Sequence, residues 1–200
     1  MNCSLVKLAY EGDYDTIVSL VENNSSLIRE TDEFGHSALF SAVISKHLKI
    51  CSYLIAKGCD VNERSLEDNT PLHLACQQGH FSICQFLIQH HADVKALNEA
   101  GCTPLHEAML APRSARITAY LVMSGADMNA KDYEDRAPLH RAAQMGHIEH
   151  CQALLDIDQG INMHIKSAQG QPIVYFACQH RKYRICSILI ERGACIDELN

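Results

Sequence analysis

The chain has 200 residues, of which 47% are hydrophobic and 20% are charged, with only 10 glycines and 5 prolines. This composition is typical of a globular protein and excludes a collagen-like chain or a chain that is disordered throughout. Lys and Arg number 17 against 24 Asp and Glu, so the net charge is −7 with neutral histidines, which argues against binding to nucleic acid or to an anionic membrane.

No segment has the pattern of an export signal or of a membrane span. The longest apolar stretches, such as residues 173–178, are too short to cross a bilayer, and residues 1–10 lack the apolar centre of a secretory signal. Several of the ten cysteines stand beside apolar runs, as Cys51, Cys84 and Cys186 do, and we expect them to be small core residues. We therefore expect an intracellular, reducing location in the cytoplasm, and the nucleus also fits.

A motif recurs about every 33 residues along the chain. Its clear copies are residues 69–75, 102–108 and 136–142, and weaker copies stand at residues 36–42 and 171–177. Each copy ends on an alanine, and these alanines are spaced by 33, 33, 34 and 35 residues: Ala42, Ala75, Ala108, Ala142 and Ala177. Ala9 lies 33 residues before Ala42 and marks a sixth, degenerate copy. A second motif, from Gly58–Asn62 to residues 193–197, keeps the same period.

The two motifs resemble those of the ankyrin-repeat family, whose signature includes Thr-Pro-Leu-His-x-Ala at this period. The resemblance covers residues 5–197 and implies an all-α solenoid. This array would contain about six helix-turn-helix units joined by short β-hairpin or turn connections. We expect a single domain over residues 1–200, with approximate units 1–31 (a degenerate N-terminal cap), 32–64, 65–97, 98–131, 132–166 and 167–200.

The expected elements follow in chain order. Residues 5–24 have the apolar spacing of a helix pair without the motif, as a terminal unit does. In later units a first helix begins at Pro71, Pro104 or Pro138, and Thr70 and Thr103 can cap the first two of these helices. That helix ends near a Gly-His turn, and an apolar second helix such as residues 81–88 follows.

Two units depart from the common length. Unit 98–131 has one extra residue, and Pro112 predicts a wider turn between its helices. Unit 132–166 has two extra residues within 156–159. Neutral drift of loops or a partner-specific contact would explain either insertion. No polar closing unit follows residues 195–197, so either the charged last unit caps the array or the chain is part of a longer protein.

Catalytic and metal motifs are absent from the sequence. It contains no Gly-x-Ser-x-Gly, no phosphate-binding glycine loop and no His-Glu-x-x-His. The resemblance implies a structural role for the motif histidines His73, His106 and His140. Two groups have the residue types of zinc ligands, but each coincides with the ordinary inter-helix turn: Cys76-His80-Cys84 and His147-His150-Cys151. We therefore predict no catalytic residue, no metal site and no cofactor.

The resemblance implies a protein partner on the concave face, formed by hairpin tips and first helices. The candidate binding residues are Phe34, His36, Leu66, Asn69, Gln77, Leu110, Tyr133, Arg136, Gln144 and Met145. Further exposed first-helix positions are expected at Ile44, Ser45, Gln78, Ala111, Gln179 and His180. Four glutamates are expected to repeat at one tip position and to favour a basic segment of the partner: Glu33, Glu67, Glu99 and Glu134. In the alternative, the tips are merely solvated and Phe34 and Leu66 pack against neighbouring tips.

The predicted function is that of a monomeric protein–protein interaction module, a scaffold or adaptor. The alternatives are a substrate-recruiting or regulatory domain of a larger enzyme or ubiquitin-ligase adaptor, and a host-directed microbial effector. Asn62 and Asn129 each follow a leucine eight residues earlier, and they resemble ankyrin asparagines that an intracellular hydroxylase modifies.

Overall fold

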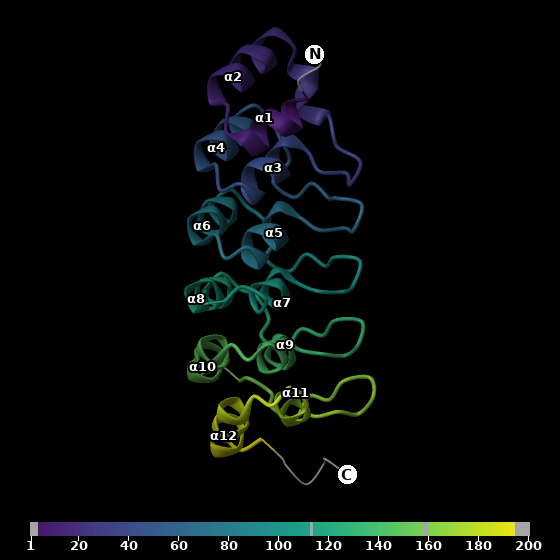
Figure 1. The fold of residues 1–200 in the computed structure, drawn as a ribbon, viewed down its shortest axis with the longest axis vertical. Coiled ribbons are helices and arrows are strands. Elements are labelled where there is room, and N and C mark those ends of the chain that lie inside the picture. Colours follow the sequence, from purple (N-terminus) through teal and green to yellow (C-terminus); the bar gives the residue numbers. More distant parts are fainter. Residues whose placement is uncertain (1–3, 113, 158–159, 195–200) are drawn as a thin grey trace. The chain divides into compact units, whose positions relative to one another are not determined.

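The computed structural model describes residues 4–112, 114–157 and 160–194, and its secondary structure consists mainly of pairs of short helices (Figure 1). The chain divides between Asp93 and Val94 into two compact units. Within the described ranges there is no strand, and β pairing is limited to the isolated antiparallel bridges Thr31–Ser37 and Lys166–Pro172. The predicted all-α repeat fold is confirmed, while the single domain over residues 1–200 stays a prediction.

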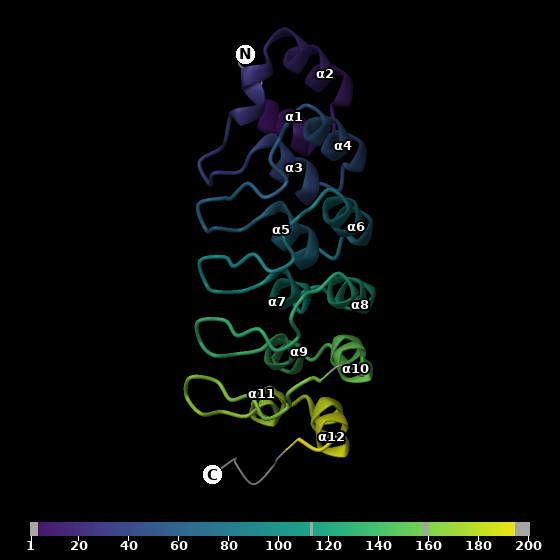
Figure 2. The same ribbon diagram turned by 180° about the vertical axis from the view of Figure 1, so that it is seen from behind.

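Unit 1 contains three helix pairs. The helices are α1 (Leu5–Glu11), α2 (Tyr14–Asn23), α3 (Ala38–Ile44), α4 (Leu48–Ala56), α5 (Pro71–Gln77) and α6 (Phe81–Gln89), and a 3₁₀ helix, η1 (Ser25–Arg29), follows α2. The first helices of the pairs, α1, α3 and α5, pack on one another in a row, and each contacts the second helix of its own pair. The hairpins emerge beside the first helices (Figure 2).

Unit 2 repeats this arrangement. Its helices are α7 (Pro104–Ala108), α8 (Ala115–Met123), α9 (Pro138–Met145), α10 (Ile148–Asp156), α11 (Ile173–Gln179) and α12 (Tyr183–Glu191). The first helices α7, α9 and α11 form one row of contacts, and the second helices α8, α10 and α12 form another. No helix in the described part of the chain combines the length and the apolar character that a bilayer crossing needs.

The first helices begin where the motif predicts. The hydroxyl oxygens of Thr70 and Thr103 accept from the backbone N–H of the motif histidine three residues on, at 3.4 Å in both cases. In return, Nδ1 of His73 and His106 accepts the threonine N–H at 3.1 Å. A proline fills the first helical position, where a missing N–H leaves no bond unmade. The structural role of these histidines is therefore confirmed.

The motif alanines lie on the first helices of the pairs. All of them are fully buried: Ala9, Ala42, Ala75, Ala108, Ala142 and Ala177. A methyl group fits such a fully buried position, whereas a longer side chain would have to displace its neighbours.

The expected wide turn occurs after α7. This helix ends at Ala108 and α8 begins only at Ala115. Two histidines of the next repeat hold the turn: His147 bonds to the carbonyl of Met109 at 2.9 Å, and His150 bonds to that of Ala111 at 2.7 Å. Parts of both insertions (residues 113 and 158–159) and of the last motif (residues 195–197) lie outside the described residues.

Candidate interaction surface

Five hairpin tips share one backbone geometry. In each, the first residue donates its N–H to the carbonyl four residues on, at 2.9–3.0 Å, and its carbonyl accepts the N–H of the residue three positions on, at 2.8–3.1 Å. These first residues are Asp32, Ser65, Asn98, Asp132 and Ser167. Sequence reasoning missed them, although a short polar residue recurring at the repeat period was the available signal.

Successive tips are tied to each other by single backbone bonds. In unit 1 the N–H of Leu66 donates to the carbonyl of Phe34 at 3.1 Å. In unit 2 Tyr133 donates to Ala100 at 3.1 Å, and Ala168 donates to Glu134 at 2.8 Å. The tip side chains are therefore carried on a hydrogen-bonded backbone rather than on free loops.

Three of the predicted apolar tip residues are exposed: Phe34 by 60%, and Leu66 and Tyr133 by 74% each. Leu66 also lies over Gly35, because a Cβ on that glycine would come within 2.9 Å of the Leu66 nitrogen. In the same way, a Cβ on Gly101 would come within 2.6 Å of the ring of Tyr133. Contact with a neighbouring tip and exposure to solvent thus occur together. Packing of these residues against neighbouring tips therefore does not exclude that they bind a partner.

The ring of Phe34 is linked to the core by ring contacts through His36 and Phe40. It lies 5.9 Å from the ring of His36, which stacks on Phe40 at 5.2 Å. Phe40 is fully buried in α3. The exposed aromatic ring is therefore backed by others that are anchored in the core.

Arg136 is held in a charged network of unit 2. It forms ion pairs of 3.0 Å with Asp132 and with Glu134, and its side chain is only 19% exposed. Burial acts to raise the pKa of Asp132, but N–H donors from Arg136 and Glu134 and the charge of Arg136 lower it below its usual value. Arg136 thus stabilises its own hairpin through these ion pairs.

Arg141 extends this network to the preceding repeat. It pairs with Glu107 at 3.3 Å and with Asp132 at 3.6 Å. Sequence reasoning missed this link. The signal was the opposite charge of Glu107 and Arg141 at the same variable position of two successive motifs.

The first-helix candidates differ in exposure. Gln78, Met145, Gln179 and His180 are exposed. The half-buried members are Ile44, Ser45, Gln77, Leu110 and Gln144, and Asn69 at its tip is also half-buried. The expectation for Ala111 was wrong, because the residue is 2% exposed. Since α7 ends at Ala108, Ala111 falls in the wide turn that His150 covers.

The four tip glutamates are exposed, but they do not repeat at one position. Glu33 and Glu99 directly follow the first residue of their tips, whereas Glu67 and Glu134 are one residue farther on. The carboxylates therefore alternate between two tip positions, and the expected single register is wrong.

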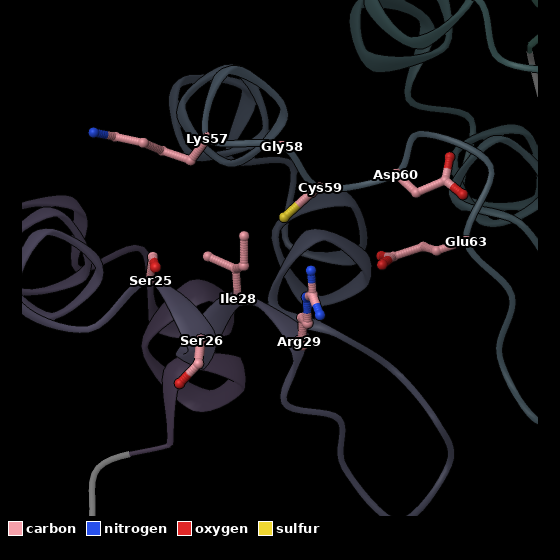
Figure 3. Close-up of a pocket in the computed structure, with 9 residues that line it drawn as sticks. All are labelled: Ser25, Ser26, Ile28, Arg29, Lys57, Gly58, Cys59, Asp60 and Glu63. Carbon is pink, nitrogen blue, oxygen red and sulfur yellow. The ribbon is translucent and has the colours of Figure 1, made fainter.

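A cavity of about 860 Å³ lies in unit 1, between η1 and the connection after α4 (Figure 3). Its lining residues are Ser25, Ser26, Ile28, Arg29, Lys57, Gly58, Cys59, Asp60 and Glu63. Figure 3 shows Arg29, Cys59 and Glu63 turned inward and Lys57 turned away. Burial raises the pKa of the Cys59 thiol to about 12, so the thiol is protonated at neutral pH and is no nucleophile. Sequence reasoning did not identify this cavity.

The residues with zinc-ligand chemistry have other partners. Nδ1 of His80 bonds to the carbonyl of Val43 at 3.0 Å, and the sulfur atoms of Cys76 and Cys84 lie 3.7 Å apart. Among the described residues, no group of three His, Cys, Asp or Glu side chains is placed to hold a metal ion.

Asn62 and Asn129 each bridge to the following repeat. Their Nδ2 atoms donate to the carbonyls of His91 and Gly160 at 3.2 and 3.0 Å. Their Oδ1 atoms accept the N–H of Asp93 and Asn162, both at 2.8 Å. Hydroxylation at these asparagines stays a prediction.

Comparison with known proteins agrees with the repeated helix pairs of the structure. A family model described as "Ankyrin repeats (3 copies)" matches residues 4–98, 58–132 and 116–200. Inversin of Homo sapiens is 27% identical over 175 residues, which is 86% of this chain and 16% of that protein. The chain thus spans about a sixth of the length of this relative.

Two further relatives have different names. A probable 26S proteasome regulatory subunit p28 of Saccharomyces cerevisiae is 24% identical over 152 residues, covering 74% of this chain and 67% of that protein. NF-kappa-B inhibitor alpha of Gallus gallus is 32% identical over 63 residues, covering 32% of this chain and 20% of that protein. With the family model spanning both units, the chain belongs to the ankyrin-repeat family, whose fold is generally a non-enzymatic scaffold for protein–protein interaction.

Proposed function

We propose that this chain is a protein-recognition module that binds its partner through the hairpin tips and the adjoining first-helix positions. The observation that carries the proposal is the set of exposed apolar side chains, Phe34, Leu66 and Tyr133, on tips joined by backbone hydrogen bonds. Large apolar side chains on an ordered backbone can anchor a partner with little loss of conformational freedom on binding. The proposed secondary contacts are half-buried Asn69, Gln77, Leu110 and Gln144 and exposed Met145.

The proposed partner is a protein with a basic segment. Four exposed glutamates alternate along the same tips as the apolar residues. Charges at the rim of an interface mainly increase the association rate and select the partner. The name of the relative NF-kappa-B inhibitor alpha describes a protein that acts on another protein, which supports a protein partner here.

Photocrosslinking from single positions tests the proposal. A photoreactive phenylalanine analogue replaces Phe34 in unit 1 or Tyr133 in unit 2 of the full chain in its native cell. Matched controls carry the analogue at Tyr10 in unit 1, which is 59% exposed, or at Tyr183 in unit 2, which is 71% exposed. We expect a discrete crosslinked protein from each tip position and none from its control.

Binding of the purified partner gives the quantitative test. Phe34→Ala or Tyr133→Ala should weaken binding at least tenfold, which corresponds to about 1.4 kcal/mol, because each removes an apolar anchor. Tyr10→Ala and Tyr183→Ala should change affinity less than twofold. Equal losses for tip and control variants would contradict the proposal.

The charge of the partner is tested separately. Glu33→Gln and Glu99→Gln each remove one exposed tip carboxylate, and they should slow association most at low salt. Unchanged association rates would contradict a basic partner while leaving the anchoring role of the tips intact.

A recruiting domain of a larger enzyme or ubiquitin-ligase adaptor, or a host-directed effector, would use the same tips. The identity of the crosslinked protein separates these alternatives.

A further inference from the structure

Two thiols lie against each other in the last helix pair of unit 2. Cys178 is near the end of α11 and Cys186 is in α12, and their sulfur atoms are 3.2 Å apart. Cys178 is exposed, whereas Cys186 is 8% exposed. The pair therefore combines a thiol that solvent reaches with a second thiol directly behind it.

A second pair in the chain has the same spacing but a different environment. Cys76 in α5 and Cys84 in α6 are also eight residues apart, with sulfur atoms at 3.7 Å. Both are fully buried. Dissolved reagents can reach neither sulfur without unfolding, so this pair is an internal control for the first.

We propose that Cys178 and Cys186 are a site of reversible oxidative modification, at which a small-molecule disulfide such as glutathione disulfide converts the two thiols into an intramolecular disulfide. The sulfur atoms need to close from 3.2 Å to the bonding distance of about 2.05 Å. Neither thiol has a disulfide partner in the structure.

The chemistry is two successive exchange steps. The Cys178 thiolate attacks one sulfur of glutathione disulfide, a mixed disulfide forms, and the first glutathione leaves and takes up the proton that Cys178 lost. The Cys186 sulfur then attacks the Cys178 sulfur and displaces the second glutathione, which takes up the Cys186 proton. Two protein thiols are oxidised to one disulfide, and one glutathione disulfide is reduced to two glutathione molecules.

The environment of the pair agrees with this order. Only Cys178 is exposed to the incoming reagent, so it reacts first. Burial, together with the neighbouring Cys178, raises the pKa of Cys186 to about 11, so its thiolate is scarce and the second step is the slower one. The connection between the helices carries the exposed cation Arg181, and the first turn of α12 carries exposed Arg184; both attract the carboxylates of glutathione.

The bond would tie α11 to α12 across their connection. A cross-link between the two helices of one pair restricts their separation. We therefore expect slower hydrogen exchange of the α12 amides in the oxidised chain than in the reduced chain.

Peptide mapping of the folded chain tests the proposal. The chain is incubated with glutathione disulfide, quenched in acid with a thiol-blocking reagent, digested and analysed by mass spectrometry. We expect a Cys178–Cys186 linked peptide that reduced glutathione reverses, while Cys76 and Cys84 remain reduced. Cys186→Ser should accumulate glutathione on Cys178, because the second step is removed, and Cys178→Ser should leave Cys186 unmodified.

Two results would overturn the proposal. One is a wild-type chain that keeps glutathione on Cys178 without forming the linked peptide. The other is linkage of Cys76 to Cys84 at the same rate, which would show that unfolding exposes both pairs alike. Circular dichroism of each serine variant establishes that it is folded, and the wild-type map decides the question without the variants.

Discussion

Glu63 joins two segments of unit 1 that are 26 residues apart in the chain. Its carboxylate accepts a hydrogen bond from the hydroxyl of Ser37, whose oxygen in turn accepts the N–H of Leu39 at 3.0 Å at the start of α3. Burial raises the pKa of Glu63 to about 7, against the lowering effect of the Ser37 bond, and the charge of Asp60 adds to the rise. The start of α3 therefore depends on a group that titrates near neutral pH.

Glu63→Gln should change the pH dependence of stability. Between pH 4.5 and about 7 the folded chain holds a proton on Glu63 that the unfolded chain has released, so the free energy of unfolding falls as pH rises through this window. The variant lacks this titration. Relative to the variant, the wild type should lose about 2 kcal/mol between pH 5 and pH 8, measured by urea unfolding.

The comparison with the variant removes the contributions of the other titrating groups to the pH dependence of stability. His106 and His140 act in the opposite direction, because burial lowers their pKa values to about 4 and acid therefore destabilises the folded chain. Parallel pH profiles for wild type and Glu63→Gln would contradict the assigned role of Glu63.

The starts of the first helices show what a single hydroxyl contributes to an element. α9 begins after Ala137, which has the extended backbone of Thr103 (φ −81° and ψ 164° against φ −85° and ψ 166°) but no hydroxyl. The ring of His140 still accepts the Ala137 N–H at 3.1 Å, so the histidine half of the cap persists without the threonine half.

Ala137→Thr should therefore stabilise α9. The new hydroxyl would accept the N–H of His140 as Thr103 does for His106, which adds about 0.5–1 kcal/mol to the free energy of unfolding. Thr103→Ala is the matched opposite and should lose about 1 kcal/mol. Urea unfolding measures both, and a destabilised Ala137→Thr variant would show that this buried position has no room for the larger side chain.

At the scale of the whole molecule, the chain consists of two compact units, each built from contacts between neighbouring repeats. In such an array, stability is close to a sum of repeat and nearest-neighbour contributions. A destabilising substitution should therefore lower the stability mainly of the unit that contains it.

Ala142→Leu and Ala42→Leu test this locality. Each places extra methylene groups at a fully buried position on a first helix, α9 or α3, at an expected loss of about 1–3 kcal/mol. Hydrogen exchange should quicken mainly in unit 2 for Ala142→Leu and mainly in unit 1 for Ala42→Leu. Equal acceleration throughout the chain in both variants would show that the two units unfold together.

Much of the fold was predictable from the sequence, because its determinants are local and recur. A capping threonine acts within one helical turn, and the motif alanine is fully buried in each repeat. These features placed the helix starts at Pro71, Pro104 and Pro138, and they identified Phe34, Leu66 and Tyr133 as exposed tip residues.

Contacts between repeats depend instead on how one helix pair is set against the next, which no single motif encodes. Only the tertiary structure brought Arg141 to Glu107, placed Ala111 under His150, and set the sulfur of Cys178 beside that of Cys186. Such contacts join side chains from different helices, and their distances follow from packing. The sequence by itself therefore determined the repeat and its exposed tips, because the pattern of buried and exposed residues recurs within each repeat. The tertiary structure decided which side chains meet, because such contacts depend on how two elements pack against each other.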